Sequence, residues 1–263
     1  MINKKFKYMS FLYSSSSHQG DRAYQEDSCL WLESADQQSL GFVLSDGMGG
    51  HAAGDLASQT LVNTYAQTFN TRGFSGNVVE SLAVSLQEGN NQIQALIQDG
   101  TGTLGMGATY LAGVVSRDRV NWISVGDSPL YLFRKAKIKQ INEDHSMTPI
   151  FKEQVATGEL TQDEAAKHPR RDDLYSAVMG GQIEEIDQPT AALPLHIGDI
   201  IIAASDGIQV LDETEMEVII NQWVNSGYKG CLCQRLIEAV LQKKHHHQDN
   251  VTVMAVALVD VGN

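Results

Sequence analysis

The chain has 263 residues, of which 42% are hydrophobic and 19% are charged, and its formal net charge is -13. This length suits one large hydrophobic core, and no stretch resembles a linker, so we expect a single domain over residues 1–263. The negative charge argues against nucleic acid or an anionic membrane as a partner, since both favour basic surfaces.

The cysteines and the N-terminal segment bear on the cellular compartment. Cys29, Cys231 and Cys233 lack the spacing of a zinc knuckle, and their odd number is typical of reduced thiols. No apolar stretch long enough for a signal peptide follows Met1, and no window approaches a membrane span. We therefore expect a cytoplasmic protein.

The first hundred residues predict a loop, two short strands and two long helices. The serines at 14–17 favour a loop, and the apolar runs at 28–32 and 40–44 predict strands. Apolar residues then recur at helical spacing, and a second amphipathic stripe runs over 79–97. The first stripe consists of Ala57, Leu61, Tyr65 and Phe69. Both stripes are expected to face the core.

The central part of the chain returns to β character. Strands are predicted at 109–115, 120–125 and 130–133. Short polar turns at Arg117-Asp118 and Gly126-Asp127 join them, so we expect two hairpins and an antiparallel sheet.

The rest of the chain alternates between helical and strand patterns. Residues 142–174 are mostly polar and helical, with a capping box from Thr161 to Glu164. A strand at 199–204, helices at 213–225 and 231–242, and a last strand at 251–259 complete the pattern.

Four aspartates lie at the ends of these apolar strands, each next to a glycine or asparagine: Asp46, Asp127, Asp206 and Asp249. Glycine allows positive φ and a close approach of the backbone to a ligand. One such pair alone is typical of a plain turn. Four together favour carboxylates gathered at one rim of a sheet, where they would raise each other's pKa unless a cation neutralised them. A hard metal ion held by oxygen ligands is the simplest such cation.

With these elements in place, the sequence resembles the PP2C-type (PPM family) metal-dependent protein serine/threonine phosphatases, in the form typical of the bacterial branch. The resemblance covers nearly the whole chain. Each matching stretch is weak alone, but the ordered set is specific. The stretches are Arg22-Ala-Tyr-Gln-Glu-Asp27, Ser45-Asp-Gly-Met-Gly-Gly-His51, Gly105-Met-Gly-Ala-Thr109, Val125-Gly-Asp-Ser128, Glu143-Asp-His-Ser146, Ser205-Asp-Gly207 and Asp249-Asn-Val-Thr252.

The resemblance implies an α+β fold, an α-β-β-α sandwich of two antiparallel sheets flanked by helices, with a flap segment at about 146–179. It also implies two Mn²⁺ or Mg²⁺ ions. Asp46 would bridge them, Asp206 and Asp249 would complete the protein ligands of the first ion, and Glu26 with the carbonyl of Gly47 would complete those of the second.

Further roles are implied at neighbouring positions. Asp27 would hold a metal-bound water, Arg22 would bind the substrate phosphate, and Asp127 with Asp206 would hold a third, weaker ion. The eukaryotic form of the family has a histidine, proposed as general acid, where this chain has Met48. For His51 a structural hydrogen bond is favoured over acid catalysis.

The predicted function is hydrolysis of phosphoserine and phosphothreonine by direct attack of a metal-bridging water. Phosphoprotein substrates, a partner serine/threonine kinase and a monomeric state follow as expectations. The alternative is a catalytically weak phosphoprotein-binding regulatory module with the same fold. Retention of every expected carboxylate favours the enzyme, because nothing else would stabilise a bare cluster of acids.

Overall fold

The computed structural model describes residues 9–50, 52–171, 173–244 and 246–260. Within them, two five-stranded antiparallel sheets and a small strand pair form the β structure. The first sheet has the order β1 (Met9–His18), β12 (Val251–Asp260), β11 (Ile200–Ala204), β8 (Leu130–Arg134), β9 (Lys137–Gln140). The second sheet has the order β10 (Leu193–Pro194), β7 (Arg119–Val125), β6 (Tyr110–Ser116), β3 (Ser39–Ser45), β2 (Ser28–Glu33). The small pair is β4 (Gly47–Met48) with β5 (Gly107–Ala108).

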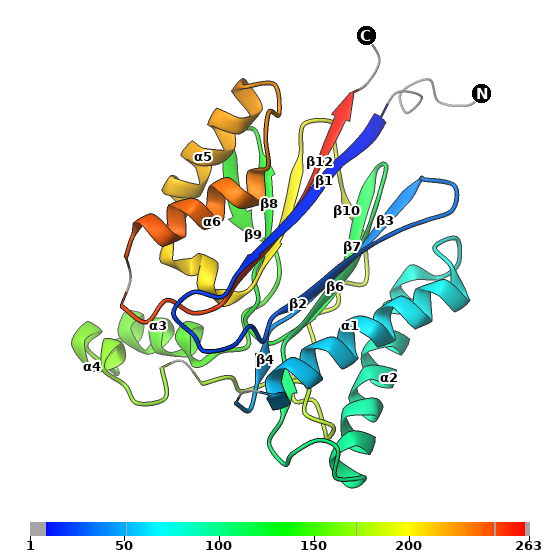
Figure 1. Ribbon diagram of the computed structural model, residues 1–263. Coiled ribbons are helices and arrows are strands. Elements are labelled where there is room, and N and C mark those ends of the chain that lie inside the picture. The colour runs from blue at the N-terminus through cyan, green and yellow to red at the C-terminus, as the bar shows by residue number, and fades with distance from the viewer. Residues whose placement is uncertain (1–8, 51, 172, 245, 261–263) are drawn as a thin grey trace.

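Helices cover the outer faces of both sheets. Helices α1 (Ala52–Arg72) and α2 (Val78–Gln98) pack on the second sheet, and α5 (Glu213–Asn225) and α6 (Leu232–Gln242) pack on the first (Figure 1). The predicted α-β-β-α sandwich of antiparallel sheets is thus confirmed. Two shorter helices, α3 (Met147–Thr157) and α4 (Gln162–Ala166), lie beside one end of the sheets, within the segment predicted as a flap (Figure 1).

The strands at the centre of the sandwich are buried on both faces, which explains their continuous apolar runs. In β3, Phe42 and its neighbours two residues away face the other sheet, whereas Val43 faces α1 and α2. In β11, Ile201 packs between the sheets and Ile202 packs against α5 and α6. This alternation follows from the two-residue period of side chains along a strand.

The amphipathic stripes lie where the sequence predicts them. All four residues of the first stripe belong to α1 and are buried. The Tyr65 hydroxyl also donates a hydrogen bond to the Gly113 carbonyl in β6 at 2.9 Å. The capping box at Thr161 and Glu164 is present at the start of α4.

The loop prediction for the serines at 14–17 is wrong, because these residues belong to β1. This edge strand pairs with β12 along its whole length, from Met9 opposite Asp260 to His18 opposite Val251. The Thr252 hydroxyl of β12 donates to Ser17 Oγ at 2.9 Å. The apolar partner strand therefore imposes β structure on a run that has little propensity of its own.

The hairpin predicted at Gly126-Asp127 is also wrong. β7 belongs to the second sheet and β8 to the first, so the chain crosses between the sheets at this turn. The turn at Arg117-Asp118 is a hairpin, since it joins the paired strands β6 and β7. Local sequence does not separate the two cases, because both join apolar strands through short polar turns.

No helix within the described ranges is both long and apolar enough to cross a membrane.

Candidate active site

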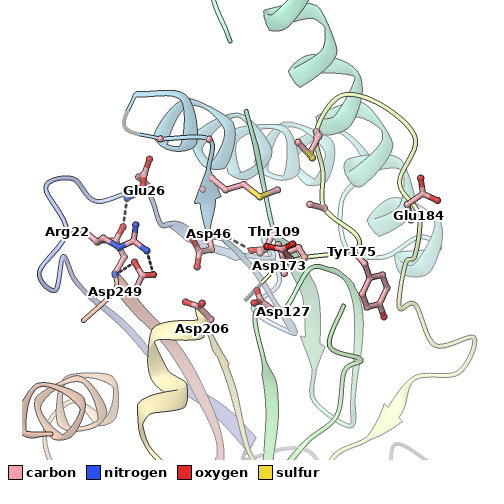
Figure 2. Close-up of a pocket in the computed structure, with 18 of the residues that line it drawn as sticks. Arg22, Glu26, Asp46, Thr109, Asp127, Asp173, Tyr175, Glu184, Asp206 and Asp249 are labelled. Atoms are coloured by element: carbon pink, nitrogen blue, oxygen red, sulfur yellow. Dashed lines mark hydrogen bonds and ion pairs between the residues drawn. The ribbon is translucent and has the colours of Figure 1, made fainter. Parts of the chain in front are cut away.

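The predicted site residues gather around one cavity of about 710 Å³ at the end of the two sheets. Figure 2 shows Asp46, Asp127 and Asp206 directed toward the same space, with Arg22 and Asp249 at one side. The predicted residues in its lining are Arg22, Glu26, Asp46, Gly47, Asp127, Asp206 and Asp249. Asp27 is buried behind this lining, and its Oδ2 accepts a hydrogen bond from Ser205 Oγ at 2.8 Å.

Asp46 is fixed at the end of β3 by Thr109. The Asp46 backbone N–H donates to Thr109 Oγ1, and the Thr109 N–H donates to the Asp46 carbonyl, both at 2.9 Å. A third contact joins Thr109 Oγ1 to Ser128 Oγ at 2.8 Å, next to Asp127. In the sequence, Thr109 appears only as the end of a motif, and this role was not predicted.

The glycines beside Asp46 and Asp206 allow one backbone segment to approach another. A Cβ at Gly47 would lie 2.2 Å from the Gly54 carbonyl oxygen, and one at Gly207 would lie 2.1 Å from the Asn250 carbonyl oxygen. Neither glycine has a positive φ, whereas Gly126 has φ 99°. Among these three, only Gly126 therefore uses the positive φ that glycine allows. Close packing explains the other two.

Asn250 ties the loop that bears Arg22 and Glu26 to the start of β12. Its Oδ1 accepts the Glu26 backbone N–H at 2.8 Å, and its Nδ2 donates to the carbonyls of Gln19 at 2.7 Å and Tyr24 at 3.0 Å. In the sequence, Asn250 stands out only as the neighbour of Asp249. Its position in the Asp249-Asn250 pair was the available signal.

The negative charges of the carboxylates around the cavity repel one another. Burial, followed by the negative charges of Asp27 and Asp206, raises the pKa of Asp46 well above its usual range. Burial, then the charges of Asp127 and Asp249, raises the pKa of Asp206 to about 8. Burial also raises the pKa of Asp27 to about 6. A cation in the cavity would reverse these shifts.

The donor set fits a hard divalent cation. Asp206 Oδ1 and Asp27 Oδ1 are buried and make no hydrogen bond to the described residues. Carboxylate and carbonyl oxygens suit Mg²⁺ or Mn²⁺ better than softer metals. Yet no three acidic, histidine or cysteine side chains of the described ranges converge closely enough to hold one ion. A bound ion would have to draw the repelling carboxylates together.

The opposite wall of the cavity comes from the segment after α4, the first part of which lies in the segment predicted as a flap at about 146–179; its individual lining residues were not predicted. It contributes Asp173, Tyr175 and Glu184, which Figure 2 shows away from the Arg22 side. Met48 also lines the cavity, and His51 lies outside the described residues.

A second cavity of about 440 Å³ adjoins the first under α3 and α4 and shares Asp127 and Asp206 with it.

Comparisons with known proteins identify the family of this chain. Residues 15–240 match the family model described as Protein phosphatase 2C. The chain is 31% identical over 241 residues to the serine/threonine phosphatase Stp of Listeria welshimeri, covering 89% of this chain and 90% of that protein.

Solved structures show the same fold. The S. agalactiae serine/threonine phosphatase matches with a TM-score of 0.80 and 26% identity, covering 95% of this chain and 100% of that one. The PstP catalytic domain, whose crystal structure is a complex with two manganese ions, matches with a TM-score of 0.74 and 27% identity, covering 96% and 100%. The chain therefore belongs to the protein phosphatase 2C (PPM) family, in its bacterial branch, and is a protein serine/threonine phosphatase.

Proposed function

We propose that this phosphatase hydrolyses phosphoserine and phosphothreonine in proteins, using two Mn²⁺ or Mg²⁺ ions held by its clustered carboxylates. The observation that carries the proposal is that the five predicted acidic ligands and Arg22 line one cavity; the five are Glu26, Asp46, Asp127, Asp206 and Asp249. The similar PstP catalytic domain, which contains two manganese ions, supports the number and type of ions.

In this proposal the metal ligands come from both sheets. Asp46 would be shared by the ions, Asp206 and Asp249 would complete the protein ligands of one, and Glu26 with the Gly47 carbonyl would complete those of the other. When bound, the ions would activate a water for in-line attack and neutralise charge on the phosphoryl oxygens. Direct hydrolysis without a phosphoenzyme follows.

Two residues act on the substrate and the water. The Arg22 guanidinium binds the phosphate, because its planar fork matches two phosphate oxygens at once. The buried Oδ1 of Asp27 accepts a hydrogen bond from a water in the cavity and so orients it. The Ser205 hydroxyl holds the other oxygen of Asp27 in place.

The finer expectations complete the proposal. Asp127 and Asp206 would hold a third, weaker ion, and their position in the lining of both cavities supports this. The chain is a single domain with its flap at about 146–179, acts as a cytoplasmic monomer, and dephosphorylates the products of a serine/threonine kinase.

The decisive experiment measures phosphate release from a phosphothreonine peptide with Mn²⁺ and with excess EDTA. Asp206→Asn should lower the Mn²⁺-dependent rate at least about 100-fold, since a metal ligand is lost. Asp118→Asn is the matched control, because the Asp118 side chain is 42% exposed and paired with Arg119, and Asp118 precedes β7, whereas the predicted ligand Asp127 follows the other end of that strand. No turnover by folded wild type with any divalent ion would leave the phosphoprotein-binding module as the better account.

A further inference from the structure

We propose that Asn142 and His145 are positioning residues that hold the turn carrying Asp127 and thereby set the affinity of the weaker metal site. This inference rests on the proposed function, in which Asp127 is a metal ligand. It concerns two side chains that do not line the cavity.

The turn that carries Asp127 crosses from one sheet to the other. Because β7 and β8 do not pair, the turn lacks the ladder of hydrogen bonds that a hairpin has, although its Pro129 carbonyl accepts the Ala204 N–H of β11 at 3.1 Å. Gly126 has φ 99°, and a Cβ there would lie 2.7 Å from Thr109 Cγ2, so the turn is confined on that side. Its other side needs separate support.

Asn142 forms hydrogen bonds with the backbone at the C-terminal end of the turn. Its Oδ1 accepts the Leu130 backbone N–H at 2.7 Å, and its Nδ2 donates to the Ser128 carbonyl at 3.0 Å. Nδ2 also lies 3.3 Å from Ser124 Oγ at the end of β7. Asn142 is only 8% exposed, so losing these bonds would leave buried backbone groups unpaired.

His145 forms hydrogen bonds with the backbone at the N-terminal end of the same turn. Its Nδ1 accepts the Gly126 backbone N–H at 3.2 Å, and its own backbone N–H donates to the Gly126 carbonyl at 3.1 Å. Because Nδ1 is an acceptor, the ring proton of neutral His145 resides on Nε2. The two side chains thus bracket Asp127 from Gly126 to Leu130.

His145 also connects the turn to the cavity wall. Its carbonyl accepts the Tyr175 backbone N–H at 3.0 Å, and the two ring centroids are 5.8 Å apart. Tyr175 lines the cavity on the side opposite Arg22. The position of Asp127 and the position of this wall therefore depend on one buried histidine.

The support that Asn142 and His145 give to this turn matters because Asp127 lies close to the other acidic residues. Its charge contributes to the raised pKa of both Asp46 and Asp206. Residues that orient a ligand without touching the metal commonly change metal affinity by about 10–100-fold when removed. Asn142 and His145 occupy that place relative to Asp127.

Calorimetric titration of EDTA-treated full-length protein with Mn²⁺ tests the inference without relying on activity. Asp127→Asn identifies the binding phase that depends on Asp127. Asn142→Leu and His145→Leu should each weaken that phase about tenfold or more and leave the tighter binding unchanged. His145→Asn should restore it, because the asparagine Oδ1 can replace Nδ1 as the acceptor for Gly126.

Asn90→Leu is the matched control. Asn90 is also a buried asparagine that holds a turn, accepting the Gly180 N–H at 2.8 Å and donating to the Gly181 carbonyl at 2.7 Å. That turn carries no predicted metal ligand, so this variant should lose stability and keep its Mn²⁺ binding. Adding Asn142→Leu to Asp127→Asn should cause no further change in Mn²⁺ binding.

The outcomes separate this inference from the proposed third ion. If Asp127→Asn leaves every binding phase unchanged, the third ion and the inference both fail. Suppose instead that Asp127→Asn removes one binding phase. If Asn142→Leu and His145→Leu then affect this phase no more than the control Asn90→Leu does, the inference alone fails. Should the leucine variants not fold, His145→Asn and His145→Gln replace them. Only His145→Gln, whose acceptor is displaced by one bond, should weaken the phase, and equal binding by both would overturn the inference.

Discussion

Arg22 and Asp249 are hydrogen-bonded to each other, with Arg22 Nη2 as donor and Asp249 Oδ2 as acceptor. The residue proposed to bind the substrate phosphate is thus paired with a proposed metal ligand. The Arg22 side chain is 55% exposed, so solvent screens this pair. A metal ion on Asp249 would release the guanidinium for the phosphate.

Arg22→Ala should therefore have opposite effects on substrate and metal. The KM for a phosphothreonine peptide should rise about 10–100-fold, as expected for a lost hydrogen bond to a charged group. The Mn²⁺ concentration for half-maximal binding should fall about two- to fivefold, because a screened competing charge is removed. Steady-state kinetics and Mn²⁺ titration measure the two. Arg22→Lys, which keeps the charge without the fork, should keep the Mn²⁺ affinity and still raise KM, and weaker Mn²⁺ binding by Arg22→Ala would contradict this account.

Removal of metal should make stability depend on pH. An unfolded aspartate has a pKa of about 3.9, whereas folded Asp206 has a pKa of about 8. Between these values the folded state holds a proton that the unfolded state lacks. The stabilisation is therefore full below pH ~4 and is lost as pH rises through ~8.

Melting temperature measured in EDTA should accordingly fall from pH 5.5 to pH 8, within that ~4–8 window. Saturating Mn²⁺ should reduce the slope, since the carboxylates are then charged in the folded state throughout. Asp206→Asn should flatten the EDTA curve, and Asp118→Asn, at an exposed position, should not. A rise in melting temperature over this range in EDTA would refute the assignment.

Gly47→Ala should destabilise the protein by about 1–3 kcal/mol, because the new methyl group would press on the Gly54 carbonyl. Urea unfolding measures the change. Gly76→Ala is the matched control, since a Cβ at Gly76 meets no atom within 4 Å. Equal stability of the two variants would show that the β4–α1 contact tolerates a side chain.

Asn250→Ala should lower the free energy of unfolding by about 2 kcal/mol, because the Glu26 N–H and two loop carbonyls lose their partner. Phosphatase activity should fall as well, since the loop bearing Arg22 and Glu26 is no longer tied to β12. Asn70→Ala, on the exposed face of α1, provides the control for asparagine loss. Wild-type activity in the Asn250 variant would exclude a role in holding the loop.

The sequence predicts those parts of the fold that local patterns determine. The four-residue recurrence of Ala57, Leu61, Tyr65 and Phe69 identifies α1 because one helix face must be apolar to pack on a sheet. β1 escapes such analysis, since its serines are held by pairing with β12, some 240 residues away in the chain. The crossover at Gly126 cannot be predicted from the local sequence for a similar reason, because tertiary packing decides which sheet a strand joins.

The candidate site divides in the same way. Asp46, Asp206 and Asp249 can be found because a charged residue at the end of a buried strand is unusual and the motifs place it. Thr109 and Asn250 act through hydrogen bonds to residues far away in sequence, such as Asp46 and Glu26. The identities of these two residues alone do not predict their hydrogen-bond partners.

The proposed metal ligands are divided between two sheets that, over the residues the structure describes, share no hydrogen-bonded strand pair. Asp46 follows β3 of the second sheet, and Asp249 precedes β12 of the first. A slip of one residue between the sheets, about 3.3 Å, exceeds a metal–oxygen bond of about 2.1 Å. Metal affinity thus measures how well the layer containing Phe42 and Met254 aligns the sheets. A repacked core would be detected as weaker Mn²⁺ binding while the protein remained folded.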